Sequence, residues 1–162
     1  MDLLRAVIVG ASGTPYHDGL FFFDLQLPPS FPATPLLVGT PEGQRNELPY
    51  CENTYLLNLR TMLHLLHRPP VGFLAFVKHH FRCHGQRIIR SCEASYMEGC
   101  LVGTLDGEGR LTDSSREQPS STGFRVALHN VLPRLVEALV DIGAKGCEQH
   151  RTPPSTSELT TH

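Results

Sequence analysis

The chain has 162 residues, 40% of them hydrophobic and 19% charged, which is enough for one ordinary globular domain. Its formal net charge of −2 and the lack of a basic stripe argue against nucleic-acid binding. No apolar run approaches about 18 residues, so no membrane span is expected, and the N-terminus lacks a signal-peptide cleavage site. The five cysteines form no spaced framework, which fits reduced thiols and predicts a cytoplasmic or nuclear protein.

The first predicted element is a β-hairpin over residues 3–27. Residues 3–9 are an apolar run, and residues 20–27 alternate between apolar and polar side chains as a half-buried strand does. The alternation places four large apolar side chains on one face: Phe21, Phe23, Leu25 and Leu27. Because two strands alone are marginally stable in water, this face needs a cover.

A proline-rich segment follows over residues 28–35. Proline has no N–H to give to a β-ladder, so this segment ends the second strand. We expect an ordered, extended loop here, and the start of a third strand at residues 36–38.

Three helices are predicted next, over about 54–67, 71–83 and 86–99. Asn53 or Thr54 is the expected N-cap of the first, which stops before two consecutive prolines. Gly85 is expected to end the second helix, and Arg87 to point outward from the third. Apolar side chains at helical spacing are the expected core: Leu56, Leu59, Leu63, Leu66, Phe73, Phe76, Val77, Phe81, Ile88, Ile89, Cys92 and Tyr96, with Tyr55, Leu57 and Met62 near the first group and Met97 near the last.

The C-terminal part is predicted to hold one more helix between two segments without structure. Residues 104–123 are rich in Gly, Ser, Asp and Glu and read as a flexible linker. Residues 124–143 carry an apolar helical face, with Pro133 breaking or kinking its middle. Residues 144–162 are polar and are expected to form a disordered tail.

The hairpin and its prolines resemble the central β-meander of the ubiquitin-conjugating enzyme family. The matching pattern is G-x-x-G-T-P-Y-x-x-G-x-F, an apolar strand, and P-x-x-F-P-x-x-P. It is carried by Gly10, Gly13, Thr14, Pro15, Tyr16, Gly19, Phe21, Pro28, Phe31, Pro32 and Pro35. Residues 51–58 and the segments HRPP, FVKHHFR and SYMEGCLVG resemble the large plant members of the phosphate-signalling type. The resemblance implies an α+β class: a partial fold of this family, an antiparallel hairpin or meander followed by C-terminal helices.

The chain departs from the family pattern after residue 38. The family continues to a His-Pro-Asn turn, a catalytic cysteine and a tryptophan-bearing loop, whereas this chain has neither His-Pro-Asn nor any tryptophan. We therefore interpret residues 1–103 as a truncated domain of an internally deleted form, joined at Val38 and Gly39. For full-length relatives the resemblance implies ubiquitin, an activating enzyme and a ubiquitin ligase as partners.

No catalytic cysteine can be identified from the sequence. Thioester formation needs an exposed thiolate with donors that stabilise an oxyanion. Cys83 and Cys92 fall on predicted helices and Cys100 at a helix end, where buried, inert roles are commoner. Cys51 lies at a helix N-terminal boundary that could lower its pKa, but its surroundings match no nucleophile motif.

By the same resemblance, Phe31, Pro32, Ala33, Thr34 and Pro35 match the family's ligase-docking loop. Ala33 stands where many relatives carry a large apolar side chain, and Leu36 replaces a second proline. A rigid proline turn that shapes the strand exit explains the same residues.

Other site chemistries are less well supported. His64 and His67 are three residues apart, and a second group follows at His79, His80, Cys83 and His84. Zinc sites usually need spaced ligand pairs, so we expect no metal and interpret these as solvated helix residues. VIVGASGTPY lacks the third glycine and the following helix of a dinucleotide-binding turn, and no G-K-[ST] phosphate loop occurs. Although family members are associated with ATP binding, no cofactor is expected here.

Two functions remain open from the sequence. One is a member of the ubiquitin-conjugation pathway that is catalytically impaired in this form, and the other is a non-catalytic fragment that binds a ligase or another partner. The uncovered phenylalanine face also predicts poor solubility of the isolated chain.

Overall fold

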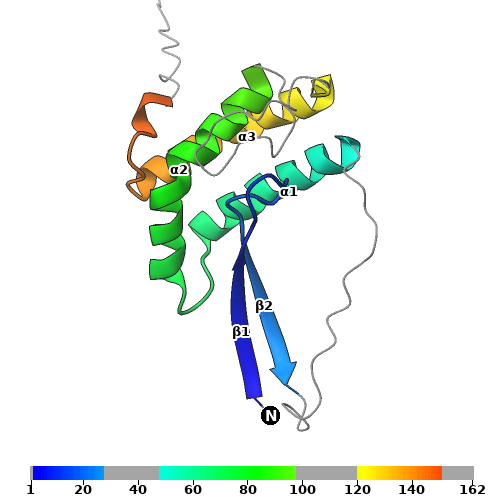
Figure 1. Ribbon diagram of the computed structural model, residues 1–162. Coiled ribbons are helices and arrows are strands. Elements are labelled where there is room, and N and C mark those ends of the chain that lie inside the picture. Colours follow the sequence, from blue (N-terminus) through cyan, green and yellow to red (C-terminus); the bar gives the residue numbers. More distant parts are fainter. Residues whose placement is uncertain (1, 28–47, 98–119, 151–162) are drawn as a thin grey trace, which may run out of the picture.

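The computed structural model describes residues 2–27, 48–97 and 120–150 (Figure 1). Two strands, β1 (Asp2–Val9) and β2 (Leu20–Leu27), precede three helices and a final 3-10 turn, η2 (Glu148–His150). The helices are α1 (Leu48–His67), α2 (Leu74–Met97) and α3 (Thr122–Asp141). The α+β class predicted from the sequence is confirmed.

The two strands form an antiparallel hairpin that runs in register from Asp2 opposite Leu27 to Val9 opposite Leu20. The N–H of Gly10 donates to the carbonyl of Gly19 at 2.8 Å, which continues the pairing into the loop. The loop end of the hairpin lies against the helices, and the strands extend away from them (Figure 1). The antiparallel pairing excludes the dinucleotide-binding turn, which requires a strand that leads directly into a helix.

The helices cover only the loop end of the hairpin, on the face opposite to the predicted phenylalanine face. Leu20 is buried, and Phe22 packs against Phe73 with ring centroids 5.1 Å apart. On the other face, Phe23 and Ile8 are 45% and 56% exposed. Leu20 and Phe22 are covered because they lie at the loop end, nearest the helices. No described helix covers the face that was predicted to need a cover, although the ring of Tyr16 contacts Phe21 at its loop end.

Helix α1 begins six residues before the predicted start. Asn53 and Thr54, the expected N-caps, lie inside the helix, which starts at Leu48. Pro49 is compatible with this start because a proline in the first turn removes no intrahelical hydrogen bond. The helix ends at His67, as predicted. Leu57 is 63% exposed and does not join the core that buries Tyr55 and Leu59.

Helix α2 is one continuous helix where the sequence predicts two. Gly85 does not end a helix but lies inside α2, which changes direction partway along its length (Figure 1). A Cβ atom on Gly85 would lie 2.9 Å from the Cβ of Ala144 and 3.2 Å from the sulfur of Cys147. The glycine therefore allows the segment after α3 to approach α2 closely.

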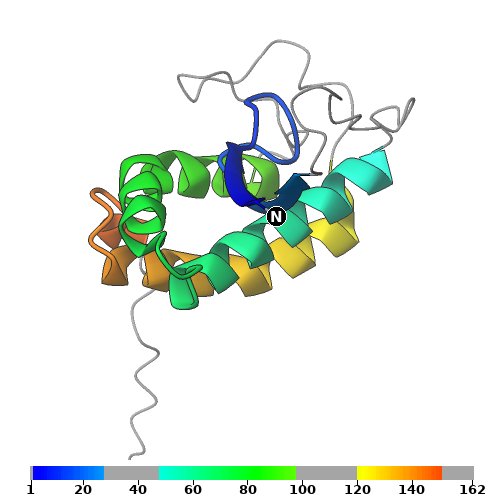
Figure 2. The ribbon, with the colours of Figure 1, turned by 90° about the horizontal axis from the view of Figure 1, so that it is seen from below.

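Helix α3 belongs to the same core as α1 and α2. Its N-cap is Ser121, so the last residues of the predicted linker are ordered, and the helix continues through Pro133, which excludes the break that was one of the two predicted outcomes. Burial of Leu128 and Leu135 on either side offsets the cost of an internal proline, about 3 kcal/mol. Helices α1 and α3 run side by side in the same direction (Figure 2).

The start of the predicted disordered tail is also packed into this core. Ala144 and Cys147 are fully buried, and η2 follows them. The remaining parts of the predicted linker and tail, residues 104–119 and 151–162, lie outside the described residues, as do residues 28–47. Among the helices that the structure describes, none is both long and apolar enough to cross a lipid bilayer.

Candidate functional site

A polar cluster fastens the hairpin loop to α1 and α2. We call it the loop clamp, and its members come from three parts of the chain: His17 and Asp18 of the loop, Tyr55 and Asn58 of α1, and His80, Arg87 and Ser91 of α2. All except Arg87 are buried. Buried polar groups are costly unless they are hydrogen-bonded, so the clamp fixes one loop position relative to the helices.

Asp18 is the centre of the loop clamp. Its carboxylate accepts a hydrogen bond from Nε of Arg87 at 2.9 Å and lies 3.2 Å from Nδ1 of His17. Burial alone would raise the pKa of Asp18, but the hydrogen bonds from His17 and Arg87 lower this pKa to about 2. Asp18 has a φ of 59°, a left-handed conformation that aspartate and asparagine adopt more readily than most residues.

The backbone of the loop is held by two further side chains. Nδ2 of Asn58 donates to the carbonyls of Pro15 at 3.3 Å and His17 at 3.1 Å. Nε2 of His80 donates to the carbonyl of Asp18 at 2.8 Å, and burial lowers the pKa of His80. A Cβ atom on Gly19 would lie 2.1 Å from Oδ1 of Asn58, so only glycine fits there.

Gly10, Gly13 and Thr14, which belong to the sequence pattern described above, determine the shape of the hairpin loop. A Cβ atom on Gly10 would lie 1.8 Å from the carbonyl oxygen of Tyr16, and Gly13 has a φ of 76°. The hydroxyl of Thr14 donates to the carbonyl of Ala11 at 2.7 Å. These contacts give the predicted glycine and threonine positions a structural role in the turn.

Tyr16 then joins the loop to β2 and α1. Its ring meets Phe21 edge-on at a centroid distance of 5.8 Å, and its hydroxyl lies 2.7 Å from the hydroxyl of Tyr50. The pattern residues Tyr16 and Phe21 thus connect the hairpin to the first turn of α1.

Three residues of the clamp have the connectivity of a hydrolase triad. Nε2 of His17 lies 2.9 Å from Oγ of Ser91, and its Nδ1 faces Asp18. A working triad needs a serine that a substrate can reach, whereas Ser91 is 3% exposed and Tyr55 donates to its oxygen at 3.1 Å. These hydrogen bonds therefore have a structural role: they connect the loop to the helices.

Three of the four described cysteines are buried. Burial raises the pKa of Cys51 and of Cys147, and it raises that of Cys92 to about 12. For Cys51 this corrects the expectation of a lowered pKa at a helix boundary, because its buried side chain and the neighbouring Glu52 charge both disfavour the thiolate. Cys83 is exposed, and its sulfur lies 3.8 Å from Nε2 of His79. Cys100 lies outside the described residues.

His67 and His84 make only local contacts, whereas His80 is buried in the loop clamp, which corrects the expectation that it is a solvated helix residue. The ring of His67 contacts the carbonyl of Leu63 at 2.7 Å, and that of His84 contacts the carbonyl of His80 at 2.8 Å. In the described part of the chain, no group of three or more His, Cys, Asp or Glu side chains is arranged to hold a metal ion. The predicted ligase-docking loop, Phe31 to Pro35, lies outside the described residues.

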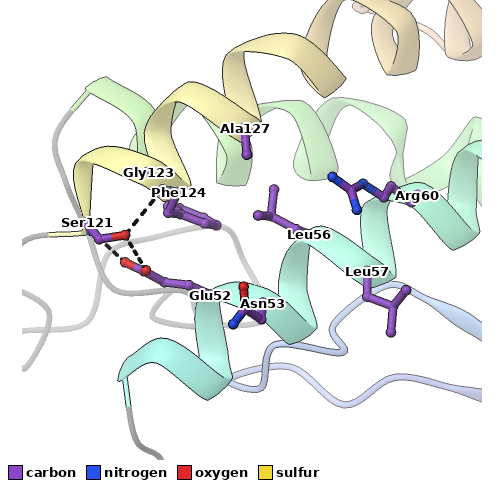
Figure 3. A pocket seen from close by; sticks show the side chains of 9 residues that line it. All are labelled: Glu52, Asn53, Leu56, Leu57, Arg60, Ser121, Gly123, Phe124 and Ala127. Carbon is purple, nitrogen blue, oxygen red and sulfur yellow. Dashed lines mark hydrogen bonds between the residues drawn. The ribbon is translucent and has the colours of Figure 1, made fainter.

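A second feature is an open pocket between α1 and the start of α3 (Figure 3). It has a volume of about 650 Å³ and is lined by apolar and polar side chains of both helices. At one end the carboxylate of Glu52 accepts hydrogen bonds from the backbone N–H and the hydroxyl of Ser121, both at 2.6 Å. Glu52 thereby joins the N-terminus of α3 to α1.

Sequence reasoning missed the loop clamp and the Glu52–Ser121 contact. Arg87 was expected to point outward, but it binds Asp18, which lies 69 residues earlier. One signal was available: Tyr55 falls in the middle of an apolar helical face, and a buried tyrosine hydroxyl usually has a hydrogen-bond partner. The identity of that partner depends on how distant segments pack.

Comparison with known proteins finds relatives whose sequences align with most of this chain. It is 35% identical to "Probable ubiquitin-conjugating enzyme E2 23" of Arabidopsis thaliana over 214 positions, which cover 89% of this chain and 19% of that protein. It is 31% identical to "Probable ubiquitin-conjugating enzyme E2 24" and 26% identical to "Putative ubiquitin-conjugating enzyme E2 38" of the same plant. These matches cover 96% and 99% of this chain, and 24% and 70% of the relatives. The chain thus spans less than a quarter of the first two relatives, and no protein-family model matches it.

Proposed function

Because this chain belongs to the ubiquitin-conjugating enzyme (E2) family, we propose that it takes part in ubiquitin conjugation without carrying ubiquitin as a thioester itself. The observation that carries this proposal is the state of the described cysteines. Cys51, Cys92 and Cys147 are buried, and burial raises the pKa of each thiol. A thioester-forming cysteine needs the opposite, an accessible thiol with a lowered pKa.

The exposed Cys83 is also poorly suited to acyl transfer. It lies inside α2, where backbone N–H groups are used in helical hydrogen bonds and are not free to stabilise an oxyanion. Its neighbour His79 provides one imidazole but no oxyanion site. Alkylation or oxidation of Cys83 is compatible with this setting, whereas carriage of a ubiquitin carboxyl terminus is not.

An internal deletion accounts for the missing catalytic segment. The alignment with the first relative runs over 214 positions, more than the 162 residues of this chain, so the relative has residues there without a counterpart here. This supports a form that lacks the segment expected after Val38. Sequencing the transcript across the Val38–Gly39 junction tests it, because a retained exon there would restore the cysteine.

The role that remains for such a form is binding. Its proposed partners are those of the pathway: ubiquitin, the activating enzyme, and a ubiquitin ligase bound through Phe31 to Pro35. The alternative is a non-catalytic fragment that holds a partner through its helices, which the open pocket between α1 and α3 favours. The free cysteines fit a reducing compartment, the cytoplasm or nucleus.

A charging assay tests the proposal directly. The full chain is incubated with activating enzyme, ATP and ubiquitin, beside a relative that contains the catalytic segment as a positive control. We expect a reductant-sensitive ubiquitin adduct for the relative and none for this chain. A reductant-sensitive adduct that disappears in Cys83→Ser or Cys100→Ser would overturn the proposal and identify the carrier.

A further inference from the structure

The pocket between α1 and α3 has an apolar floor and an open wall. Leu56 and Phe124 form buried parts of its lining, at 8% and 3% exposure, while Leu57 at its edge is 63% exposed. A volume of about 650 Å³ is within the usual range for binding pockets, about 300–1,000 Å³. The pocket can therefore accept a bulky aliphatic side chain from outside.

One wall of this pocket is open at Gly123, and neither the backbone conformation nor close packing requires a glycine there. Gly123 does not have a positive φ, and a Cβ atom placed on it would meet nothing within 4 Å. By contrast, Gly85 is required by close packing and Gly143 by its φ of 77°. The space beside Gly123 is therefore open, and a larger side chain at this position would occupy it.

The two charged side chains that line the pocket, Glu52 and Arg60, differ in their contacts. The carboxylate of Glu52 is already occupied by the backbone N–H and hydroxyl of Ser121. Arg60 lies two turns further along α1, is exposed, and has no hydrogen-bond or ion-pair partner among the described residues. Figure 3 shows its guanidinium pointing into the space between the two helices. The guanidinium of Arg60 therefore offers a planar set of N–H donors that can bind a carboxylate.

We propose that this pocket is a docking site for an acidic amphipathic helix of a partner protein. An aliphatic side chain of the partner enters between Leu56 and Ala127, beside Gly123, and a carboxylate about one helical turn away binds Arg60. Aliphatic and acidic side chains four residues apart lie on one helix face, which matches the spacing of the apolar floor and Arg60 along α1. The proposal does not rest on thioester chemistry, because a chain that cannot be charged can still bind such a helix.

Fluorescence anisotropy with the full chain tests the site. The probe is a labelled synthetic peptide of about 14 residues, or about four helical turns, in which leucines and glutamates lie four residues apart. Two matched peptides replace the glutamates by lysines or the leucines by serines. We expect binding of the first peptide only, and binding that is weaker by roughly fivefold in Arg60→Glu.

Three variants distinguish binding in the pocket from nonspecific electrostatic binding to the surface. Arg60→Glu should bind the lysine peptide, which the parent chain does not bind, and should bind the glutamate peptide more weakly. Gly123→Leu should abolish binding while the melting temperature stays the same or rises, because its side chain fills the open wall. Arg125→Glu makes the same charge change on an exposed residue of α3 outside the pocket and should bind normally. Absence of binding to the glutamate peptide, equal binding of all three peptides, or an unchanged affinity in Gly123→Leu would each overturn the proposal.

Discussion

The carboxylate of Asp18 and the guanidinium of Arg87 meet across 69 residues of sequence and join the hairpin loop to α2. Asp18 is almost fully buried, whereas the side chain of Arg87 is 30% exposed. The pair is therefore partly shielded from water, and it is one of several contacts that hold the loop in position. The consequences for stability can be measured.

Asp18→Asn isolates the charge of this pair. Asparagine has nearly the same shape and also adopts the left-handed conformation that Asp18 occupies, so the backbone should be unaffected. Asp18→Asn removes the negative charge that Arg87 and His17 both contact, and we expect the free energy of unfolding to fall by about 2–3 kcal/mol at pH 7. Urea unfolding measures it. A cost as small as that of the exposed variant Asp24→Asn would show that the pair contributes little.

The same pair predicts a pH dependence at low pH. The pKa of Asp18 is about 2 in the folded chain, against an ordinary value of 3.8. A carboxylate with a depressed pKa stabilises the fold above the unfolded pKa and loses that contribution as the pH falls through the folded one, here between about pH 4 and 2. The contribution is about 2 kcal/mol. Unfolding free energies of the parent and Asp18→Asn should converge over this window; parallel curves would refute the assignment.

Glu52 and Ser121 should be energetically coupled. Ser121→Ala removes the N-cap of α3 and one hydrogen bond to Glu52, at an expected cost of about 1 kcal/mol. Glu52→Ala leaves the Ser121 N–H without its acceptor, at a cost of about 1–3 kcal/mol. In a double-mutant cycle the two costs should not add, because both changes remove the same contact. Strict additivity would mean that Glu52 does not act through Ser121.

Two glycines provide a matched pair of substitutions. Gly85→Ala forces a Cβ atom to within 2.9 Å of Ala144, so we expect a loss of about 1–3 kcal/mol and release of the segment after α3. Gly123→Ala meets no atom and should be neutral or stabilising by about 0.4–1 kcal/mol. Thermal unfolding with hydrogen exchange of residues 144–150 distinguishes them. Equal effects of the two alanines would contradict the close approach at Gly85.

The uncovered face of the hairpin predicts self-association. Phe23 and Ile8 are about half exposed on a sheet that has two strands within the described residues, and such apolar strands associate readily. Phe23→Lys should therefore reduce association in sedimentation velocity at micromolar concentration without lowering the melting temperature. Val71→Lys, at a position that is 93% exposed but away from the hairpin, is the control. A parent chain that remains monomeric throughout this range would contradict the prediction.

Local patterns were enough to predict the hairpin and the end of α1. Alternation at residues 20–27 defines β2, and two prolines fix the end of α1 after His67. The same rules failed at Gly85, where the glycine predicted a helix end, and at residues 120–123, where a polar stretch predicted a linker. Both are explained by tertiary packing: α2 uses Gly85 for a close approach, and Ser121 is fixed by Glu52.

The sites were harder to predict than the elements. His17 and Asp18 lie in a glycine-rich loop whose composition indicates only a turn, and their partners are on helices far along the chain. Cys51 was assessed from its place at a helix start, but its burial, which decides its pKa, depends on the packing of α1. Burial by distant segments leaves no local pattern in a single sequence.

Alkylation of the native chain with iodoacetamide tests most directly the claim that the described cysteines are unsuited to carry ubiquitin. Peptide mass spectrometry follows the modification of each cysteine over time, with a sample unfolded in urea as the reference. We predict that Cys83 reacts early and that Cys51, Cys92 and Cys147 stay protected until the chain unfolds. Modification of Cys51 in the native chain as fast as that of Cys83 would contradict the account.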